Sequence, residues 1–441
     1  MPLDSHIWPD TAEVSGGRLH VGGCDVTGLA MDHATPLYLI DEVTLRGSMR
    51  AYRTALARHY PGPARVHYAS KALLNTAVAQ IVAEEGLGLD VVSGAELLVA
   101  RRAGMPMGQV HMHGNAKGEA ELRRAVDWGV GAIVVDSLDE LDRLAALTHG
   151  LVRPQGVLLR VAPNIDAHTH AHIATGGATA KFGLPLESVG AAAARVLAAD
   201  GLRLLGLHAH IGSQLFEAAE IRATVAALAR EMARLRDALG VDLAELSPGG
   251  GLGVPYTADM PPTDIDAYAA ALGDAVRAAC ATYGMRPPLL TVEPGRSIIA
   301  RAGVALYRVI ARKLGPNGVP RYLHMDGGMA DNIRPALYGA RYTALLANRA
   351  ADPPGPPVDV AGRYCESGDV LLRAASLPPA GPGDLLAVAV SGAYTLSMAS
   401  TYNLVPRPAL LLVGDGVARI IQRRETEEDL LARDVPLESY L

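Results

Sequence analysis

Little in this sequence points to a membrane, to an oxidising compartment or to nucleic acid. Its three cysteines form an odd, widely spaced set without metal-type pairing, which is typical of a reducing cytoplasm. No apolar run approaches the roughly 18 residues of a membrane span, and residues 1–10 resemble neither a signal nor a transit peptide. The formal net charge of −6 does not indicate the basic surface that nucleic-acid binding requires. We therefore expect a cytoplasmic protein without a membrane or nucleic-acid partner.

What the sequence does have is a repeat of short apolar β segments, each followed by an amphipathic helix. The helical stretches carry apolar residues at three- and four-residue spacing, for example in residues 217–239. Even spacing of the strands favours a closed (β/α)8 barrel of the α/β class, because right-handed crossovers bury both faces of a parallel sheet. An open doubly wound sheet is the rival interpretation. The expected strands are 66–69, 89–92, 110–113, 132–135, 157–161, 204–208, 243–247 and 289–293.

The sequence pattern changes after residue 300, where strand-like segments alternate with Pro/Gly-rich stretches. This pattern predicts a second, mostly β domain. A chain of 441 residues with 49% hydrophobic content is long enough for two domains. We expect the barrel over residues 36–302 and the β-rich domain over residues 303–441, which residues 1–35 would join. The strands expected in the second domain are 304–312, 321–325, 358–361, 385–390, 409–413 and 417–421, with one more at 18–21.

Lys71 stands at the carboxyl end of the first expected barrel strand. Active sites of such barrels lie at that end of the strands, and a lysine flanked by apolar residues there suits covalent chemistry with an aldehyde. Taken alone, Lys71 would more often be a solvated lysine just past a strand. The groups at the later strand ends decide between the two interpretations.

Those later strand ends carry two paired histidines, a glycine run, a carboxylate and an arginine. His208 and His210 follow the sixth strand, Gly249–Gly251 the seventh, and Glu293 and Arg296 the eighth. Glycines let backbone N–H groups approach an anion, and an arginine adds a bidentate clamp on phosphate. The spacing is not that of a dinucleotide fingerprint. Together with Lys71, these groups favour pyridoxal 5′-phosphate: a lysine for the aldehyde, a carboxylate for the pyridine nitrogen, and glycines and arginine for the phosphate.

Long stretches in the right order also resemble the diaminopimelate decarboxylase family, whose pyridoxal-phosphate enzymes share an alanine-racemase-like barrel. The resemblance covers nearly the whole chain. Departures are minor, such as Leu73-Leu74 where an asparagine is common and Ala95 where a glycine is frequent. The matching stretches include TPLYLIDEVTLR (35–46), YASKA (68–72), GLGLDVVSGAEL (86–97), HGNAK (113–117), KFG (181–183), HAHIGSQ (208–214), GGGLGVPY (249–256), EPGRSI (293–298), DGGMADNIRPALYGARY (326–342), CESGDVL (365–371) and SGAYTLSMASTYN (391–403).

The resemblance implies a role for each matching position. Lys71 would attach the cofactor, His210 would stack on its ring, and Glu293 would face its pyridine nitrogen. Cys365 would donate the proton, and Tyr394 would lie near both cofactor and substrate. The phosphate positions are Ser213, Gly250, Gly251, Gly295 and Arg296, the last also near substrate, and the remaining substrate positions are Arg334, Tyr338 and Glu366.

These roles suit the decarboxylation of meso-2,6-diaminopimelate to L-lysine and CO2, the last step of lysine biosynthesis. A thiol, with an ordinary pKa of about 8.5, is a competent donor for the α-carbon at neutral pH. Arg334 offers a planar fork for the distal carboxylate of this substrate, and Glu366 offers a partner for its distal ammonium. The resemblance also implies a homodimer in which Cys365 and Glu366 complete the site of the partner chain.

Two alternatives stay open from the sequence, and a third is disfavoured. The first is a related decarboxylase that acts on ornithine, arginine or a biosynthetic intermediate, against which the presence of both Arg334 and Glu366 argues. The second is a non-catalytic relative, which could have lost Lys71 or Cys365. The third is a metal-dependent hydrolase, suggested by His208 with His210 and by the histidines at 168, 170 and 172. Such a hydrolase usually has its histidine pair after strand one and an aspartate after strand eight, so we expect no metal.

Overall fold

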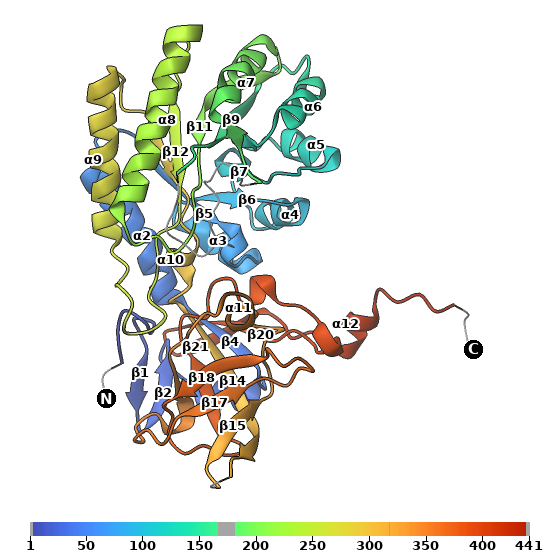
Figure 1. Cartoon of the computed structure of the whole chain (residues 1–441). Coiled ribbons are helices and arrows are strands. Elements are labelled where there is room, and N and C mark those ends of the chain that lie inside the picture. The colour runs from blue at the N-terminus through green and yellow to red at the C-terminus, as the bar shows by residue number, and fades with distance from the viewer. Residues whose placement is uncertain (1–2, 166–180, 317, 438–441) are drawn as a thin grey trace. The chain divides into compact units, whose positions relative to one another are not determined.

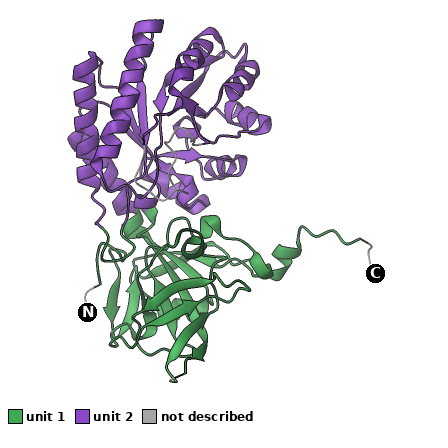
Figure 2. Cartoon of the chain, in the orientation of Figure 1, with its two compact units in different colours: residues 1–45, 255–260, 299–441 green, residues 46–254, 261–298 purple. Residues whose placement is uncertain are grey.

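The computed structural model describes residues 3–165, 181–316 and 318–437 (Figure 1). The chain divides into two compact units, shown in different colours in Figure 2. One unit comprises residues 46–254 and 261–298, and the other comprises residues 1–45, 255–260 and 299–441. We call the first the barrel unit and the second the β unit. None of the helices in the described part of the chain combines the length and apolar character that a membrane crossing needs.

The barrel unit is built on a closed parallel sheet, which confirms the predicted fold class. The strand order is β5-β6-β7-β8-β9-β11-β12-β13, and β13 returns to pair with β5 through Leu290 and Ala64. The two-residue strand β10 (Leu184–Pro185) pairs parallel with the carboxyl end of β9. The barrel strands are β5 (Ala64–Ala69), β6 (Gly88–Val91), β7 (Val110–Met112), β8 (Ala132–Val135), β9 (Gln155–Ala162), β11 (Leu202–His208), β12 (Glu245–Gly249) and β13 (Leu289–Val292).

Helices surround these strands (Figure 1), and polar caps define several of their ends. Asn75, Ser93 and Asp264 each accept a backbone N–H of the first turn that would otherwise lack a partner. Residues Ser70–Ala72 form a 3₁₀ turn, η1, and the α-helix that follows begins only after the Asn75 cap. The other elements are α2 (Glu42–His59), α3 (Thr76–Glu84), α4 (Gly94–Arg102), η2 (Met107–Gln109), α5 (Glu119–Asp127), α6 (Leu138–Thr148), α7 (Leu186–Ala198), α8 (Ala218–Leu239), α9 (Ile265–Tyr283) and α10 (Arg296–Ile299).

The β unit contains a mixed sheet in the order β18-β17-β15-β14-β4-β20-β21, with β19 pairing with both β14 and β16. Its strands are β4 (Leu37–Asp41), β14 (Gly303–Leu314), β15 (Pro320–Met325), β16 (Ala344–Leu346), β17 (Val358–Ala361), β18 (Val370–Ala375), β19 (Leu385–Val388), β20 (Ala409–Gly414) and β21 (Val417–Gln422). The short helices are α1 (Val26–Asp32), α11 (Arg334–Tyr338), η3 (Ala347–Arg349), η4 (Leu396–Met398), η5 (Tyr402–Leu404) and α12 (Glu427–Leu431). Of these strands, β4, β16 and β18 were not expected from the sequence.

A small antiparallel sheet of β1 (Glu13–Ser15), β2 (Arg18–Val21) and β3 (Cys24–Asp25) precedes β4. The carbonyl of Gly17 accepts a hydrogen bond from Ala350 N at 2.8 Å, and that of Gly22 accepts one from Gly416 N at 2.8 Å. Strand β2 coincides with the segment expected at 18–21. These bonds join the opening segment to the β unit.

Strand β4 differs from the sequence interpretation, which placed residues 36–302 in the barrel. It pairs antiparallel with β14, where Ile40 faces Gly303, and parallel with β20, where Leu37 faces Ala409. All five residues of β4 are buried. A buried, mostly apolar strand followed at once by an amphipathic helix resembles a βα unit, so its sequence cannot reveal which sheet it joins.

A buried carboxylate organises the loop that follows β15. Asp331 accepts hydrogen bonds from the hydroxyl groups of Tyr307 at 2.5 Å and Tyr38 at 3.1 Å, and from Gly328 N at 2.9 Å. Burial raises the pKa of Asp331, and although these hydrogen bonds oppose the shift, its pKa is about 6. Because the loop leads directly into α11, Asp331 fixes the path of the chain towards Arg334.

We expect Asp331 to make the stability of the protein depend on pH. Its folded pKa of about 6 lies above the ordinary value, so its contribution is complete below about pH 4 and is lost as pH rises through 6. Relative to Asp331→Asn, the wild-type free energy of unfolding should fall by up to about 3 kcal/mol between pH 4 and pH 7. Denaturant unfolding of both proteins across this range measures the difference. A difference independent of pH would contradict the assignment.

Candidate active site

The turn that carries Lys71 is fixed on both sides by hydrogen bonds. The buried Tyr68 donates its hydroxyl to the carbonyl of Leu73 at 2.7 Å, which closes the turn. Ala69 N donates to the carbonyl of Pro294 at 3.1 Å, which joins the end of β5 to the loop after β13. The side chain of Lys71 is exposed at this strand end. The structure therefore presents its amine at the carboxyl end of the barrel, as the sequence analysis expected.

His210 lies beyond the end of β11 and takes up a neutral form. Its Nδ1 accepts a hydrogen bond from Gly250 N at 3.3 Å, which leaves the proton on Nε2. Burial lowers its pKa well below the ordinary value, and the charges of Lys71 and Arg160 lower it further. A neutral, half-buried imidazole beside Lys71 can stack on an aromatic ring without placing a charge against it.

The glycine run after β12 lets three strand-end loops approach one another closely. A Cβ on Gly250 would lie 2.1 Å from the carbonyl oxygen of Glu293, and one on Gly249 would lie 2.6 Å from that of Ala209. Gly249 also has a φ of +78°, a conformation that favours glycine. The run thus serves close backbone packing as well as any anion that its N–H groups bind.

Glu293 is buried and accepts a hydrogen bond on each carboxylate oxygen. Ser247 Oγ lies 2.6 Å from Oε1, and His208 Nε2 lies 3.0 Å from Oε2. Burial by itself raises the pKa of Glu293, but its interactions with the neighbouring imidazoles, among them the hydrogen bond from His208, hold the pKa below its ordinary value. Glu293 is therefore ionised at neutral pH.

Arg296 and Ser213, both expected at a phosphate site, meet in the structure. The buried guanidinium of Arg296 donates from Nε and from an Nη atom to Ser213 Oγ at 3.2 and 3.1 Å. A Cβ on Gly295 would lie 3.1 Å from the Cβ atoms of Ala69 and Ala72, on either side of Lys71. The residues that were expected to bind the phosphate thus lie along the loops next to the lysine turn.

The chain offers few other amines for covalent chemistry. Lys117 is 2% exposed and its Nζ contacts Glu140 at 2.8 Å and the carbonyls of Gly114 and Val134 at 2.5 and 2.8 Å. Such a buried ion pair holds its ammonium in place, since loss of either partner leaves an uncompensated charge. The remaining lysines are Lys181 and Lys313.

In the β unit, Arg334 is a buried cation without an acidic partner among the described residues. Its guanidinium lies over the ring of Tyr256, 4.4 Å from the centroid, and donates to Tyr342 Oη at 2.6 Å. Its Nε makes no hydrogen bond in the described part of the chain. A buried guanidinium held by aromatic rings but lacking a counter-ion is prepared to bind an anion.

The loop with Cys365 and Glu366 exposes both side chains. Two hydrogen bonds to side chains fix its backbone: Cys365 N donates to Asn403 Oδ1 at 3.0 Å, and Tyr364 N donates to the Asp369 carboxylate at 2.8 Å. Glu366 also lines a hollow of about 810 Å³ within the β unit. A fixed backbone with outward side chains suits residues that act on a group outside their own loop.

Tyr338 and Tyr394 complete the expected set in the β unit. Tyr338 ends α11, one helical turn after Arg334, and is half-buried. Tyr394 has a φ of +57°, which is uncommon for a residue other than glycine and is concentrated at functional sites. The electrostatic interaction with Tyr394 contributes to a raised pKa of Arg334. The structure thus brings Arg334 and Tyr394 near each other within the β unit.

Several groups around the site were missed by the sequence analysis. Ser247 and His208 form hydrogen bonds with Glu293. Tyr256 packs its ring against the guanidinium of Arg334, and Tyr342 accepts a hydrogen bond from it. Glu96 interacts electrostatically with Lys71. Burial raises the pKa of Glu96, and the Lys71 ammonium partly opposes this. His208 and Ser247 were visible at strand ends, but only the fold shows which way they point. The histidines at 168, 170 and 172 lie outside the described residues.

Comparison with known proteins identifies the family. The pyridoxal binding domain of the pyridoxal-dependent decarboxylases matches residues 44–300. A diaminopimelate decarboxylase from Actinosynnema pretiosum is 44% identical over 436 residues, which cover 98% of this chain and 96% of that protein. Another from Bacillus subtilis is 41% identical over 425 residues, 96% of each chain. This chain belongs to the diaminopimelate decarboxylase family.

Solved structures of that family agree with the assignment. The crystal structure of diaminopimelate decarboxylase from M. jannaschii, in complex with L-lysine, is 32% identical with a TM-score of 0.90 and covers 97% of this chain and 98% of that one. The enzyme from Helicobacter pylori complexed with L-lysine is 31% identical with a TM-score of 0.84, covering 92% and 98%. The chain is thus a pyridoxal-phosphate-dependent decarboxylase.

The described residues fit that cofactor. Four groups lie at the carboxyl ends of neighbouring barrel strands: an ionised carboxylate, a neutral imidazole, an exposed lysine amine and an arginine–serine pair. Each matches one chemical feature of pyridoxal phosphate: the basic ring nitrogen, the ring face, the aldehyde and the phosphate.

We expect borohydride reduction of the cofactor-loaded protein to attach the pyridoxyl group permanently to Lys71. The amine of Lys71 is exposed, whereas that of Lys117 is bound by Glu140 and two backbone carbonyls. Peptide mass spectrometry locates the modified lysine. Lys71→Ala should lose the visible absorbance of the bound cofactor, whereas the control Lys181→Met should keep it. A modified Lys117 or Lys181 in the wild-type protein would refute the assignment.

Proposed function

We propose that this protein decarboxylates meso-2,6-diaminopimelate to L-lysine and CO2, the last step of lysine biosynthesis. The observation that carries the proposal is the buried Arg334 without a counter-ion, because the distal carboxylate of this substrate supplies the missing anion. The names of the curated relatives and the L-lysine in two of the similar structures support the same reaction. A lysine/ornithine decarboxylase from Vibrio vulnificus, 23% identical, shares the fold alone.

In this proposal the barrel unit binds the cofactor. Lys71 attaches it covalently, His210 stacks on its ring, and Glu293 faces its pyridine nitrogen. The bound group withdraws the electron pair that remains when the bond between the α-carbon and CO2 breaks. Glu293 supports this because a fixed negative charge keeps the neighbouring ring nitrogen protonated. The phosphate would be held by Ser213, Gly250, Gly251, Gly295 and Arg296.

The β unit supplies the groups that recognise and protonate the substrate. Arg334 pairs with the distal carboxylate and Glu366 with the distal ammonium, while Tyr338 and Tyr394 line the substrate. The barrel unit contributes Arg296 to the same set. Cys365 donates the proton that the α-carbon requires after CO2 has left, and its thiolate is then reprotonated from solvent.

A related decarboxylase specific for ornithine or arginine is the second candidate. Neither substrate has a distal carboxylate, so Arg334 would stay buried and unpaired when it bound. A site built to pair a buried polar group rejects analogues that lack the partner. Arg334 therefore favours diaminopimelate.

We expect the intact protein to turn over ornithine and lysine at least about 10⁴-fold less efficiently than meso-diaminopimelate, since both leave Arg334 unpaired. Arg334→Ala should lose activity on diaminopimelate far more than it loses cofactor, whereas Arg341→Ala, whose exposed side chain pairs with Asp259, serves as a matched control. Measurement of CO2 release with each substrate tests this. Comparable turnover of ornithine by the intact protein would refute the assignment.

We further propose that the active form is a homodimer, in which Cys365 and Glu366 of one chain serve Lys71 of the other. Two observations support this: Cys365 and Glu366 belong to a different unit from Lys71, and their side chains are exposed on an ordered loop. Two-fold dimers are also the commonest assembly of soluble proteins. We infer a cytoplasmic location, because the three cysteines are unpaired.

Mixing two inactive variants should then restore activity. Lys71→Ala and Cys365→Ala should each lose at least about 10²-fold in rate, but a heterodimer of the two contains one site with both residues intact. Random reassortment of equal amounts gives about a quarter of the wild-type number of sites. Subunit exchange is followed with differently tagged chains, and activity is measured on the mixture. Activity that stays at the single-variant level after proven exchange would exclude the shared site.

A further inference from the structure

Glu293 directly follows β13 and is held by two donors, one from the adjacent strand β12 and one from β11, the next strand beyond it. Ser247 stands in β12 and donates to Oε1 at 2.6 Å, while His208 ends β11 and its Nε2 lies 3.0 Å from Oε2. All three side chains are buried. A carboxylate oxygen accepts more than one hydrogen bond, so both oxygens keep room for a further donor, such as the ring nitrogen of the cofactor.

The surroundings determine the direction of both hydrogen bonds. Gly249 N donates to Ser247 Oγ at 3.2 Å, so the hydroxyl proton of Ser247 is directed to Glu293. His208 Nδ1 is buried and makes no hydrogen bond within the described residues. A proton there would leave a buried N–H unsatisfied, so the neutral ring carries its proton on Nε2 and donates it to Glu293. Burial also lowers the pKa of His208, which agrees with a neutral ring.

Two donors directed at the carboxylate favour the ionised form of Glu293, because a hydrogen bond to a charged acceptor is stronger than one to a neutral acceptor. Protonation of Glu293 would weaken both bonds while Ser247 and His208 stayed buried. The arrangement therefore stabilises the charge of the carboxylate.

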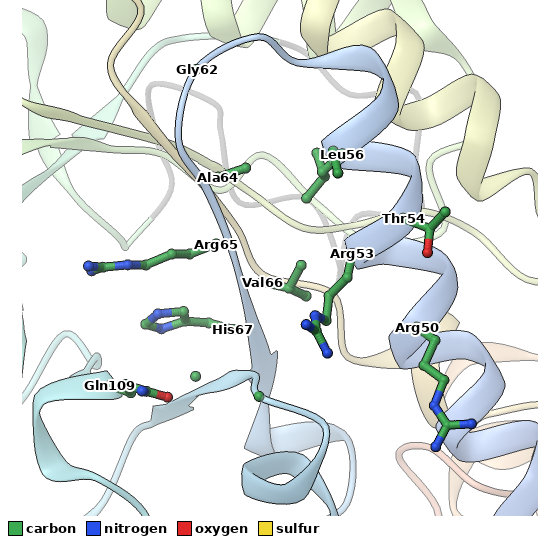
Figure 3. Close-up of a pocket in the computed structure, with 13 residues that line it drawn as sticks. Arg50, Arg53, Thr54, Leu56, Gly62, Ala64, Arg65, Val66, His67 and Gln109 are labelled. Carbon is green, nitrogen blue, oxygen red and sulfur yellow. The ribbon is translucent and has the colours of Figure 1, made fainter.

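A second layer of buried groups holds the His208 ring. His113 packs against it edge to face, with ring centroids 5.1 Å apart, and its Nε2 lies 3.3 Å from Asp90 Oδ1. The same oxygen of Asp90 is 3.1 Å from His67 Nδ1. His67 lines a hollow of about 860 Å³ at the amino ends of β5 and β6, where it points the same way as Arg65 (Figure 3). No hydrogen bond among the described residues joins His113 to His208, so this layer supports the ring by packing and charge rather than by passing a proton.

The same residues form two clusters with metal-type side chains, His67–Asp90–His111 and His113–His208–Glu293. The rings of His67 and His111 lie against each other, with centroids 4.0 Å apart, whereas imidazoles on one tetrahedral ion point towards it and diverge. In the other cluster, His208 already directs its Nε2 proton at Glu293. Both clusters are therefore better explained as a hydrogen-bonded and packed network than as metal centres.

We propose that His208 is a positioning residue for the decarboxylation, and that with Ser247 it keeps Glu293 ionised so that the ring nitrogen of the cofactor retains its proton. This rests on the proposed role of Glu293. Without the His208 donor, Glu293 becomes more basic and competes with the ring nitrogen for the same proton. The ring then loses charge and withdraws electrons less strongly, which slows the loss of CO2 but leaves Arg334 and the phosphate contacts unchanged.

Cofactor labelled with ¹⁵N in its ring gives a direct test, because its chemical shift reports protonation of that nitrogen in the holoenzyme without substrate. His208→Phe keeps a ring but removes the donor. We expect its ring nitrogen to lose its proton about one to two pH units below the wild-type midpoint, which corresponds to a 10- to 100-fold change in proton affinity. We expect kcat to fall about tenfold or more while KM changes little. His208→Gln, which retains an N–H donor, should stay near wild type in both.

The remaining variants separate the possible explanations. Ser247→Ala should shift the ring nitrogen in the same direction as His208→Phe, and it serves in place of that variant if the latter does not fold. An unchanged ¹⁵N shift in both variants would overturn the inference, and so would a His208→Gln protein that behaves like His208→Phe. Glu293→Gln tests the underlying role: if it leaves the ring nitrogen protonated, the proposed role of Glu293 fails, whereas a shift in Glu293→Gln alone would overturn only the inference about His208.

Discussion

The pairing of β13 with β5 closes the barrel, and the groups assigned to the cofactor depend on this closure. The two strands lie at opposite ends of the barrel sequence, so Lys71 and Glu293 are 222 positions apart in the chain. The hydrogen bond from Ala69 N to the Pro294 carbonyl continues the pairing past the strand ends, where Lys71 and Arg296 follow on the two sides. An open sheet would have left these two strands on separate edges. Closure thus brings the ends of β5, β11, β12 and β13 together in one site.

Much of this could be predicted from the sequence because the barrel repeats one simple pattern. Apolar strands followed by amphipathic helices located the eight strands to within about two residues. Chemistry at the strand ends selected Lys71 and Glu293, whereas the role of His210 came from the family resemblance. The sequence could not show the partners of these groups. His208 resembled half of a metal-binding pair until the fold placed it against Glu293. Ser247 was hidden because nothing in a single serine indicates that its neighbouring N–H will orient its hydroxyl.

The β unit was harder to predict, for reasons that lie in its topology. Strand β4 pairs with β14 and β20, which are distant in the chain, and no local pattern records such pairing. Tyr256 shows the same difficulty at the level of one residue. It follows the glycine run of the barrel in sequence, yet its ring lies beneath the guanidinium of Arg334 in the β unit. A buried cation and the ring that holds it are thus supplied by segments that the sequence alone assigns to different domains.

That short segment, residues 255–260, has a consequence for the history of the protein. The β unit consists of three separate stretches of chain, 1–45, 255–260 and 299–441, and the barrel unit of the two stretches between them. No single cut or fusion point in the gene separates one unit from the other. A new β unit could not have been added to an existing barrel by simple fusion at one end, and an exchange between relatives would have to replace all three stretches together. A single crossover in the gene therefore cannot exchange one unit and leave the other intact.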